Sequence, residues 1–184
     1  MRKVLIAVGC GLLLSSTAWA GSLGIMGAYW DTDQASDDTG FGVKLVVDLG
    51  QSGWRFDLRG SFIEELTTDP SIVEGDFEAY PVDFGVSYGF NTGGGKVTPA
   101  LGVGLSYVNA SSKLGEVDDE LGYYGILGLE FDAAQNFGVF VEVLYRAVDS
   151  QIDGRGLDLP FIGFDQRELE LQGVGVNAGL ALTW

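Results

Sequence analysis

Residues 54–62 of the chain read WRFDLRGSF, in which large apolar residues occupy nearly every second position. The residues between them are charged or small, so the segment has one apolar face and one mixed face. A period of two is typical of a β-strand whose two faces meet different surroundings. The segment therefore predicts a strand that separates an apolar environment from a polar one.

The same alternation recurs along the chain. It is clear in four further segments, at residues 40–49, 80–90, 97–107 and 137–146. It is less regular in three others, at residues 22–31, 120–132 and 168–184, each of which is still long and apolar enough to form a strand. Together these segments predict eight strands.

The connections between the segments alternate in length. The short ones are rich in Gly and Asn, as tight hairpins require, and span residues 50–53, 91–95 and 133–136. The long ones are polar and mostly acidic, and span residues 31–39, 65–76, 109–119 and 149–166. Short turns at one end and long loops at the other are the plan of outer-membrane barrels. The predicted fold is all-β, an eight-stranded antiparallel up-and-down transmembrane β-barrel.

The mixed face of each strand is predicted to point into the barrel. An eight-stranded barrel has an interior just wide enough for side chains. The apolar face begins and ends with aromatic residues, such as Trp54 and Phe62, as in the aromatic girdles of outer-membrane barrels. The alternative is a water-soluble, lipocalin-like barrel, in which the apolar face would point inwards.

Residues 1–20 have the features of a signal peptide. Two basic residues precede an apolar run, and a small-x-small motif ends at Ala20. We expect cleavage between Ala20 and Gly21, which leaves residues 21–184 as the barrel domain. The apolar run is shorter than the ~20 residues of a spanning helix. A lipoprotein alternative would acylate Cys10, but the preceding residues fit that motif poorly.

Composition excludes several classes of function. The chain has 10 Lys and Arg against 26 Asp and Glu, a net charge of −16, so it lacks the basic surface that binds nucleic acid. It has no His, and its single Cys lies in the predicted signal peptide. The exported chain therefore has no disulfide and no Cys or His metal ligand, and no cofactor is predicted.

The last predicted strand carries a resemblance to a known family. Residues 174–184 read VGVNAGLALTW, an alternating strand that closes on an aromatic residue. This pattern resembles the sorting signal of bacterial outer-membrane barrels, in which Leu180, Leu182 and Trp184 would be read by the barrel-assembly machinery. With the signal peptide and the eight strands, residues 21–184 resemble the OmpA/OmpX-type small outer-membrane barrels.

The resemblance implies a location in the outer membrane of a Gram-negative bacterium. The enzymes known among similar barrels use a His as acid, base or orienter, so this chain is predicted not to be an enzyme.

Nine charged residues fall on the inward face. They are Lys44, Asp48, Arg55, Asp57, Arg59, Asp83, Glu130, Glu142 and Arg146. A buried charge is costly unless it is paired, and four basic residues against five acidic ones favour pairing. We expect an interior charge network of Lys44, Arg55, Asp57, Arg59, Asp83, Glu142 and Arg146. The alternative is that these charges line a narrow conductive path.

The long loops suggest contacts outside the membrane. Their acidic clusters offer oxygen ligands to divalent cations, but no calcium-binding loop spacing occurs, so no specific metal site is predicted. We expect contacts with outer-membrane lipid and lipopolysaccharide, through shared divalent cations. The apolar run at residues 157–164 is expected either to fold back over the lumen mouth or to contact a partner or surface. The predicted function is a monomeric structural or surface-interaction scaffold, and the alternative is a narrow porin-like channel.

Overall fold

The structure of the chain is a computed structural model. It describes residues 20–32, 38–67, 76–90, 96–112, 115–116, 120–152, 167–170 and 172–184. The predicted signal peptide as far as residue 19 lies outside the described residues, as do large parts of the predicted long loops and the predicted turn at residues 91–95.

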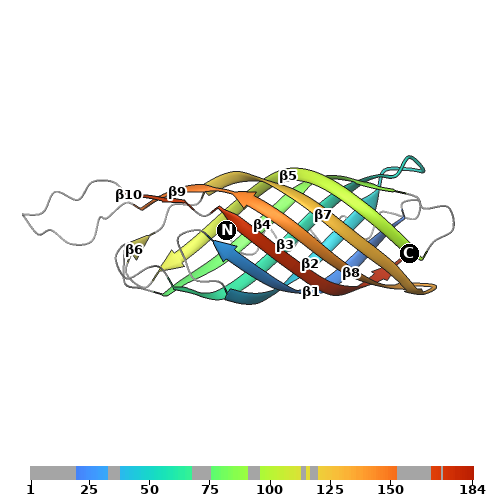
Figure 1. Cartoon of the computed structure of the whole chain (residues 1–184), viewed down its shortest axis with the longest axis horizontal. Coiled ribbons are helices and arrows are strands. Elements are labelled where there is room, and N and C mark those ends of the chain that lie inside the picture. Colours follow the sequence, from blue (N-terminus) through green and yellow to red (C-terminus); the bar gives the residue numbers. More distant parts are fainter. Residues whose placement is uncertain are drawn as a thin grey trace, which may run out of the picture.

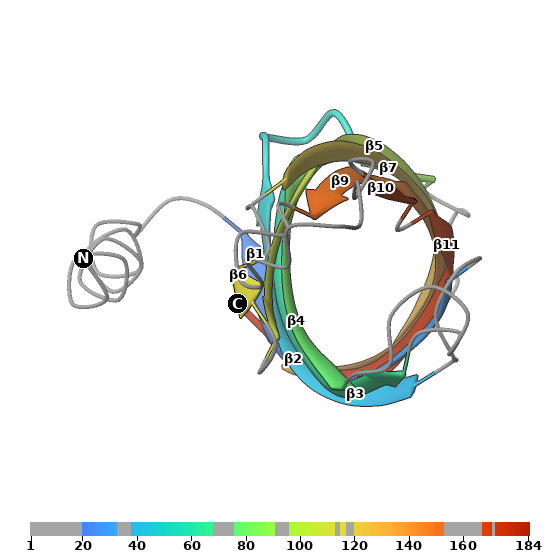
Figure 2. The same cartoon turned by 90° about the vertical axis from the view of Figure 1, so that its left-hand side faces the viewer.

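Eight long strands in the described part of the chain close into one antiparallel barrel (Figures 1 and 2). They are β1 (Gly21–Thr32), β2 (Asp38–Asp48), β3 (Trp54–Thr67), β4 (Asp76–Gly89), β5 (Val97–Ser112), β7 (Glu120–Ala134), β8 (Phe137–Ala147) and β11 (Gly173–Thr183). Each pairs with its neighbours in chain order, and β11 closes the ring against β1. The predicted eight-stranded barrel is confirmed.

Three short strands lie outside this ring. They are β6 (Gly115–Glu116), which pairs with β5, and β9 (Asp149–Ile152) and β10 (Arg167–Glu170), which pair with each other. The β9–β10 hairpin extends beyond the barrel, at the left of Figure 1.

The hairpin corrects two predicted boundaries. Residues 149–152 were predicted as loop and form β9, whereas residues 168–170 were predicted to begin the last barrel strand and belong to β10. The reason is that β1 ends at Thr32, opposite Gly173. Among the described residues before Gly173, residues 167–170 pair with β9 instead of with β1. The predicted turn at residues 133–136 is also shorter, because β7 continues to Ala134.

The turn between β2 and β3 depends on two glycines. Gly50 and Gly53 have φ values of 77° and 83°, which side-chain-bearing residues rarely adopt. The turn is closed by a hydrogen bond from the Leu49 amide to the Trp54 carbonyl oxygen, at 2.8 Å. These residues therefore set the register in which β2 and β3 begin their pairing.

The two faces of β3 show which side of the sheet points inwards. Trp54, Phe56 and Leu58 are 50%, 38% and 37% exposed, whereas the intervening charged residues are buried. The apolar face is therefore on the outside of the barrel, and the charged face lines the lumen. This arrangement excludes the lipocalin-like alternative.

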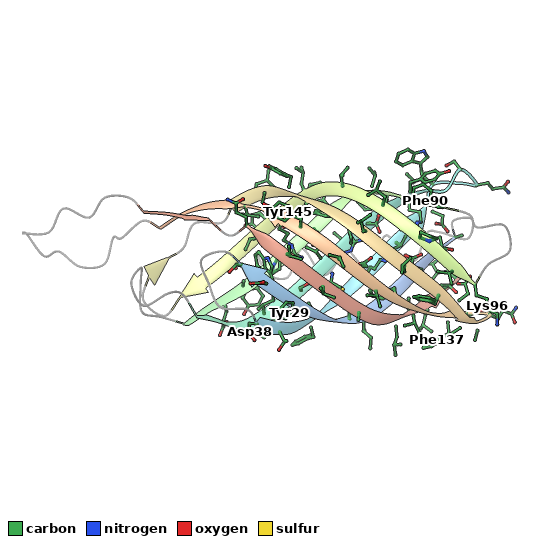
Figure 3. All side chains as sticks on the ribbon, in the orientation of Figure 1. Tyr29, Asp38, Phe90, Lys96, Phe137 and Tyr145 are labelled. Carbon is green, nitrogen blue, oxygen red and sulfur yellow. The ribbon has the colours of Figure 1, made fainter. Side chains whose placement is uncertain are left out.

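Aromatic side chains gather on the outside at two levels (Figure 3). On the side of the long loops, seven of the eight barrel strands carry one each: Tyr29, Phe41, Phe62, Tyr80, Tyr107, Tyr123 and Tyr145. The side of the short turns carries Trp54, Tyr88, Phe90, Phe131, Phe137 and Trp184. Eight residues at a rise of about 3.3 Å and a tilt of about 40° separate the levels by roughly 20 Å, close to the apolar band of an outer-membrane barrel.

Neighbouring rings within each level are in contact. Ring centroids lie 5.5 Å apart for Phe41 and Phe62, and 5.3 Å apart for Trp54 and Tyr88.

No helix long and apolar enough to cross a membrane occurs in the part of the chain that the structure describes.

Candidate functional site in the barrel lumen

All nine charged residues that were predicted to point inwards lie in the lumen, because they occupy alternate positions of five strands. Strands β2, β3, β4, β7 and β8 supply them, whereas the inward positions of β1, β5 and β11 carry uncharged residues. All seven residues of the predicted network are buried, between 1% and 8% exposed. Asp48 at the end of β2 is half-buried, and it forms no ion pair with another described residue.

Lys44 on β2 joins two carboxylates from the opposite wall. Its Nζ lies 3.0 Å from Oε1 of Glu130 on β7 and 2.6 Å from Oε1 of Glu142 on β8. Glu130 also accepts a hydrogen bond from Nη1 of Arg55 on β3. These contacts cross the lumen, because β2 and β3 are not neighbours of β7 and β8 in the sheet.

Arg59 extends this chain of ion pairs. Its Nε donates to Oε2 of Glu142 at 3.0 Å, and its Nη2 donates to Oε1 of the same carboxylate at 3.2 Å. The Nη2 atom also donates to Oδ1 of Asp57, at 3.2 Å, and Nη1 donates to Oη of Tyr124, at 3.2 Å. The result is a continuous series in the order Arg55, Glu130, Lys44, Glu142, Arg59 and Asp57, in which positive and negative charges alternate.

A separate ion pair lies nearer the loop side. Arg146 donates to both carboxylate oxygens of Asp83, from Nε at 3.1 Å and from Nη2 at 2.7 Å. The Ser106 hydroxyl donates to Oδ1 of Asp83 at 2.6 Å. The predicted network is therefore divided into two parts, of which this one holds Asp83 and Arg146.

Aromatic rings contact the cations of both parts. Lys44 Nζ lies 4.6 Å from the Phe140 ring centroid, and the guanidinium carbon of Arg146 lies 5.0 Å from that of Trp30. Such cation–π contacts stabilise desolvated cations. These rings were not predicted from the sequence, and neither were Tyr124, Ser106 and the linking role of Glu130. The sequence feature that could have identified these residues is their position on the inward face of the alternating strands.

Exposure falls steadily from the turn side to the loop side. The side chains of Glu130, Arg55 and Lys44 are 25%, 10% and 4% exposed, and that of Asp83 is 1% exposed. Beyond Asp83, on the loop side of the barrel, lies a layer of apolar side chains that are at most 1% exposed. This apolar layer consists of Trp30, Ile63, Ala79, Val108 and Val148.

Some buried polar atoms lack a partner. In the described part of the chain these are Trp30 Nε1, Arg55 Nε and Nη2, Asp57 Oδ2, Ser61 Oγ and Asn177 Nδ2. Each such atom typically costs ~1–3 kcal/mol. Pairing in the lumen is therefore extensive without being complete.

No group of three or more Asp or Glu side chains is placed to hold a metal ion among the described residues.

The remaining predicted site residues lie at the turn side. Leu180, Leu182 and Trp184, the predicted assembly signal, are 46%, 61% and 49% exposed. Gly21 opens β1, and Ala20 precedes it. The predicted cleavage between Ala20 and Gly21 stays a prediction.

Comparisons with known proteins agree with this architecture. The family model described as "Outer membrane protein beta-barrel domain" matches residues 14–181. The chain belongs to this family of outer-membrane β-barrels. It is accordingly a protein of the outer membrane of Gram-negative bacteria. No curated protein sequence matches the chain.

Solved structures with the same fold are distant in sequence. The outer membrane protein OprG from Pseudomonas aeruginosa is similar with a TM-score of 0.70 and 15% identity, over 90% of this chain and 97% of that one. Neisserial surface protein A gives 0.62 and 18%, with the same coverage. Escherichia coli outer membrane protein W gives 0.57 and 11%, over 91% and 100%. At these identities the likeness shows the fold alone.

Proposed function

We propose that this barrel is a non-conducting, non-enzymatic scaffold that displays acidic loops at the cell surface. The observation that carries the proposal is the series of ion pairs across the lumen, from Arg55 to Asp57 through Glu130, Lys44, Glu142 and Arg59. Charges held by partners on opposite walls occupy the cross-section through which an ion would pass. The buried apolar layer on the loop side adds a second barrier, because four of its five side chains are aliphatic and offer an ion no polar partner.

The loops supply the surface property of the scaffold. Of the 26 acidic residues, 20 fall in residues 31–39, 64–78, 109–120 and 149–170, together with only three basic ones. Four of the basic residues lie in the lumen, where they are paired. We therefore propose that this surface contacts the phosphates of lipopolysaccharide through shared divalent cations, since direct contact would be repulsive.

Planar-bilayer recording of the purified mature protein tests the scaffold proposal. We expect no steady conductance steps. The matched control is the variant Lys44→Ala, Arg59→Ala, Glu142→Ala combined with Ile63→Ala, which removes the centre of the series and opens the apolar layer, and it is expected to conduct if it folds. A reproducible unitary conductance from the wild-type protein would contradict the proposal.

A narrow channel is the second candidate. It is supported by the graded exposure at the turn side, where Glu130 keeps a 25% exposed side chain, and by the unpaired atoms of Arg55 and Asp57. Cation preference that changes in the Glu130→Gln variant would favour this candidate.

A further inference from the structure

We infer that the outer wall of β2, β3 and β4 holds one acyl chain of a lipopolysaccharide molecule in a shallow trough. The inference rests on the contact with lipopolysaccharide proposed above and gives that contact a place on the barrel wall. This Gly60 trough consists of Val43 on β2, Gly60 on β3 and Val82 on β4, which are partners across the sheet.

The trough is the lowest part of this wall, because it lacks a side chain at its centre. A Cβ atom added at Gly60 would have no atom of another strand within 4 Å, so the space in front of it is open. Val43 and Val82, on either side, are exposed and short. The next outward row on the turn side is taller, and it consists of Leu45, Leu58 and Phe84.

A row of aromatic rings borders the trough on the loop side. It consists of Phe41, Phe62 and Tyr80, each of which lies two residues from a trough residue on the same strand. The ring centroids of Phe62 and Tyr80 are 5.0 Å apart, and Phe62 also contacts Phe41 on its other side. Rings that pack against one another form a stiff wall, against which the methylene groups of a lipid chain gain dispersion contacts.

The depth of the trough selects the lipid. Two residues of strand, at a rise of about 3.3 Å and a tilt of about 40°, place it roughly 5 Å inside the ring row. That row belongs to the loop-side girdle, at the level of the outer headgroups, so the trough faces the first methylene groups of the outer leaflet. In the outer membrane this leaflet is lipopolysaccharide, whose saturated chains are straight enough to lie along the trough.

A carboxylate above the rings matches the phosphorylated head group of this lipid. The Tyr80 hydroxyl donates a hydrogen bond to Oε2 of Glu78, at 2.9 Å, which holds the exposed carboxylate at the loop-side rim of the ring row. Direct contact between this carboxylate and a phosphate is repulsive, but a divalent cation shared by their oxygens joins them. One lipid molecule thus meets the barrel at two neighbouring points, its chain at Gly60 and its head group at Glu78.

Binding of purified lipid A to the mature protein tests the inference. The protein is titrated with lipid A in detergent micelles that contain Mg²⁺, and native mass spectrometry counts the lipid A molecules retained on each barrel. We expect one retained molecule for the wild type and about tenfold weaker retention for Gly60→Leu, whose side chain occupies the trough. Heat-modifiable migration verifies folding of the variant, which is expected because the new Cβ atom meets open space.

A second outward glycine provides the matched control. A Cβ atom added at Gly125 on β7 would likewise have no atom of another strand within 4 Å. The partners of Gly125 in the sheet are Val103 and Tyr145, so a large ring stands in the same row and no trough forms. Gly125→Leu should therefore retain lipid A as the wild type does.

The head group is tested separately. Glu78→Gln should weaken retention of lipid A in Mg²⁺ and should match the wild type once Mg²⁺ is chelated, because the shared cation is then absent from both. A Glu78→Gln variant that matches the wild type in Mg²⁺ as well would contradict the head-group contact.

Three outcomes would overturn the trough as the lipid site. Equal retention by Gly60→Leu and the wild type would overturn it while leaving the proposed lipopolysaccharide contact of the loops intact. Equal loss in Gly60→Leu and Gly125→Leu would show that any added side chain disturbs binding. Equal retention of dioleoyl phosphatidylethanolamine would overturn the assignment to lipopolysaccharide. Absence of lipid A from the wild type in Mg²⁺ would contradict the proposed lipopolysaccharide contact as well, whereas the conductance test of the scaffold is independent of all these results.

Discussion

The two halves of the lumen are filled by side chains of different polarity. The turn-side half is filled by the alternating series of charges around Lys44 and Glu142. The loop-side half holds one isolated ion pair, Asp83 with Arg146, beneath the apolar layer.

The apolar layer inside the barrel lies at the same level as the loop-side aromatic residues on the outside. Four of its members are sequence neighbours of outward aromatic residues of the loop-side girdle: Trp30 follows Tyr29, Ile63 follows Phe62, Ala79 precedes Tyr80 and Val108 follows Tyr107. The lumen is thus apolar at the level where the outside meets lipid headgroups, and charged at the level of the hydrocarbon core. The polarity of the inside is the reverse of the polarity outside, so the charged half depends on its own pairing for stability.

The largest expected effect comes from breaking the charged series at its centre. Glu142→Gln removes the carboxylate shared by Lys44 and Arg59 and leaves two buried cations without it. We expect a loss of about 3–5 kcal/mol in the free energy of unfolding. Urea unfolding in liposomes measures it, and Glu78→Gln, which changes an exposed carboxylate, is the control. An unchanged midpoint, with altered cation preference, would favour a water-filled channel.

The isolated pair should behave as a unit. Arg146→Met leaves the buried Asp83 carboxylate with the Ser106 hydroxyl and should destabilise the barrel by about 3 kcal/mol. The double variant Asp83→Asn, Arg146→Met removes both charges and should recover most of that loss, to within about 1 kcal/mol of wild type. Equal destabilisation of the single and double variants would show that the two charges are not coupled.

Truncation in the apolar layer should have a smaller effect. Ile63 is fully buried, so Ile63→Ala is expected to reduce the free energy of unfolding by about 2–3 kcal/mol through lost burial and a cavity. Val82→Ala, on the lipid-facing side of β4, is the control and should change stability less. Ile63→Ala should also leave the ion pairs intact and the conductance at zero, because the charged series remains a barrier to ions.

The smallest expected effect is that of salt. Ion pairs that are 2–4% exposed are poorly reached by mobile ions, so raising KCl from 0.1 to about 1 M should leave the urea midpoint nearly unchanged. Osmotically matched sucrose is the control for changes in lipid packing. A marked fall of the midpoint with salt would mean that the paired charges are hydrated.

Alternation along the sequence was enough to predict the barrel and the side on which each charge lies. It did not predict which charges meet, because Arg59 and Glu142 are 83 residues apart and are brought together only by the register around the whole ring. One network was accordingly predicted where the structure has two parts. The β10 boundary was missed for a similar reason, since the limit of β11 depends on where β1 ends. The β3–β4 register is irregular between Ile63 and Leu66. The alternation is broken there as well, because Ile63 follows Phe62 and Glu65 follows Glu64.

The pairing of β1 with β11 also has a consequence for the rate of folding. It joins Ser22 to Thr183 and Thr32 to Gly173, the most widely separated partners in the sheet. Contacts of high sequence separation lose the most chain entropy before any interaction compensates for it, so they slow folding. The other seven seams join barrel strands that follow one another along the chain, so each can form between consecutive strands without waiting for the ring to close. Closure of the β1–β11 seam is therefore the step that should set the folding time of the barrel.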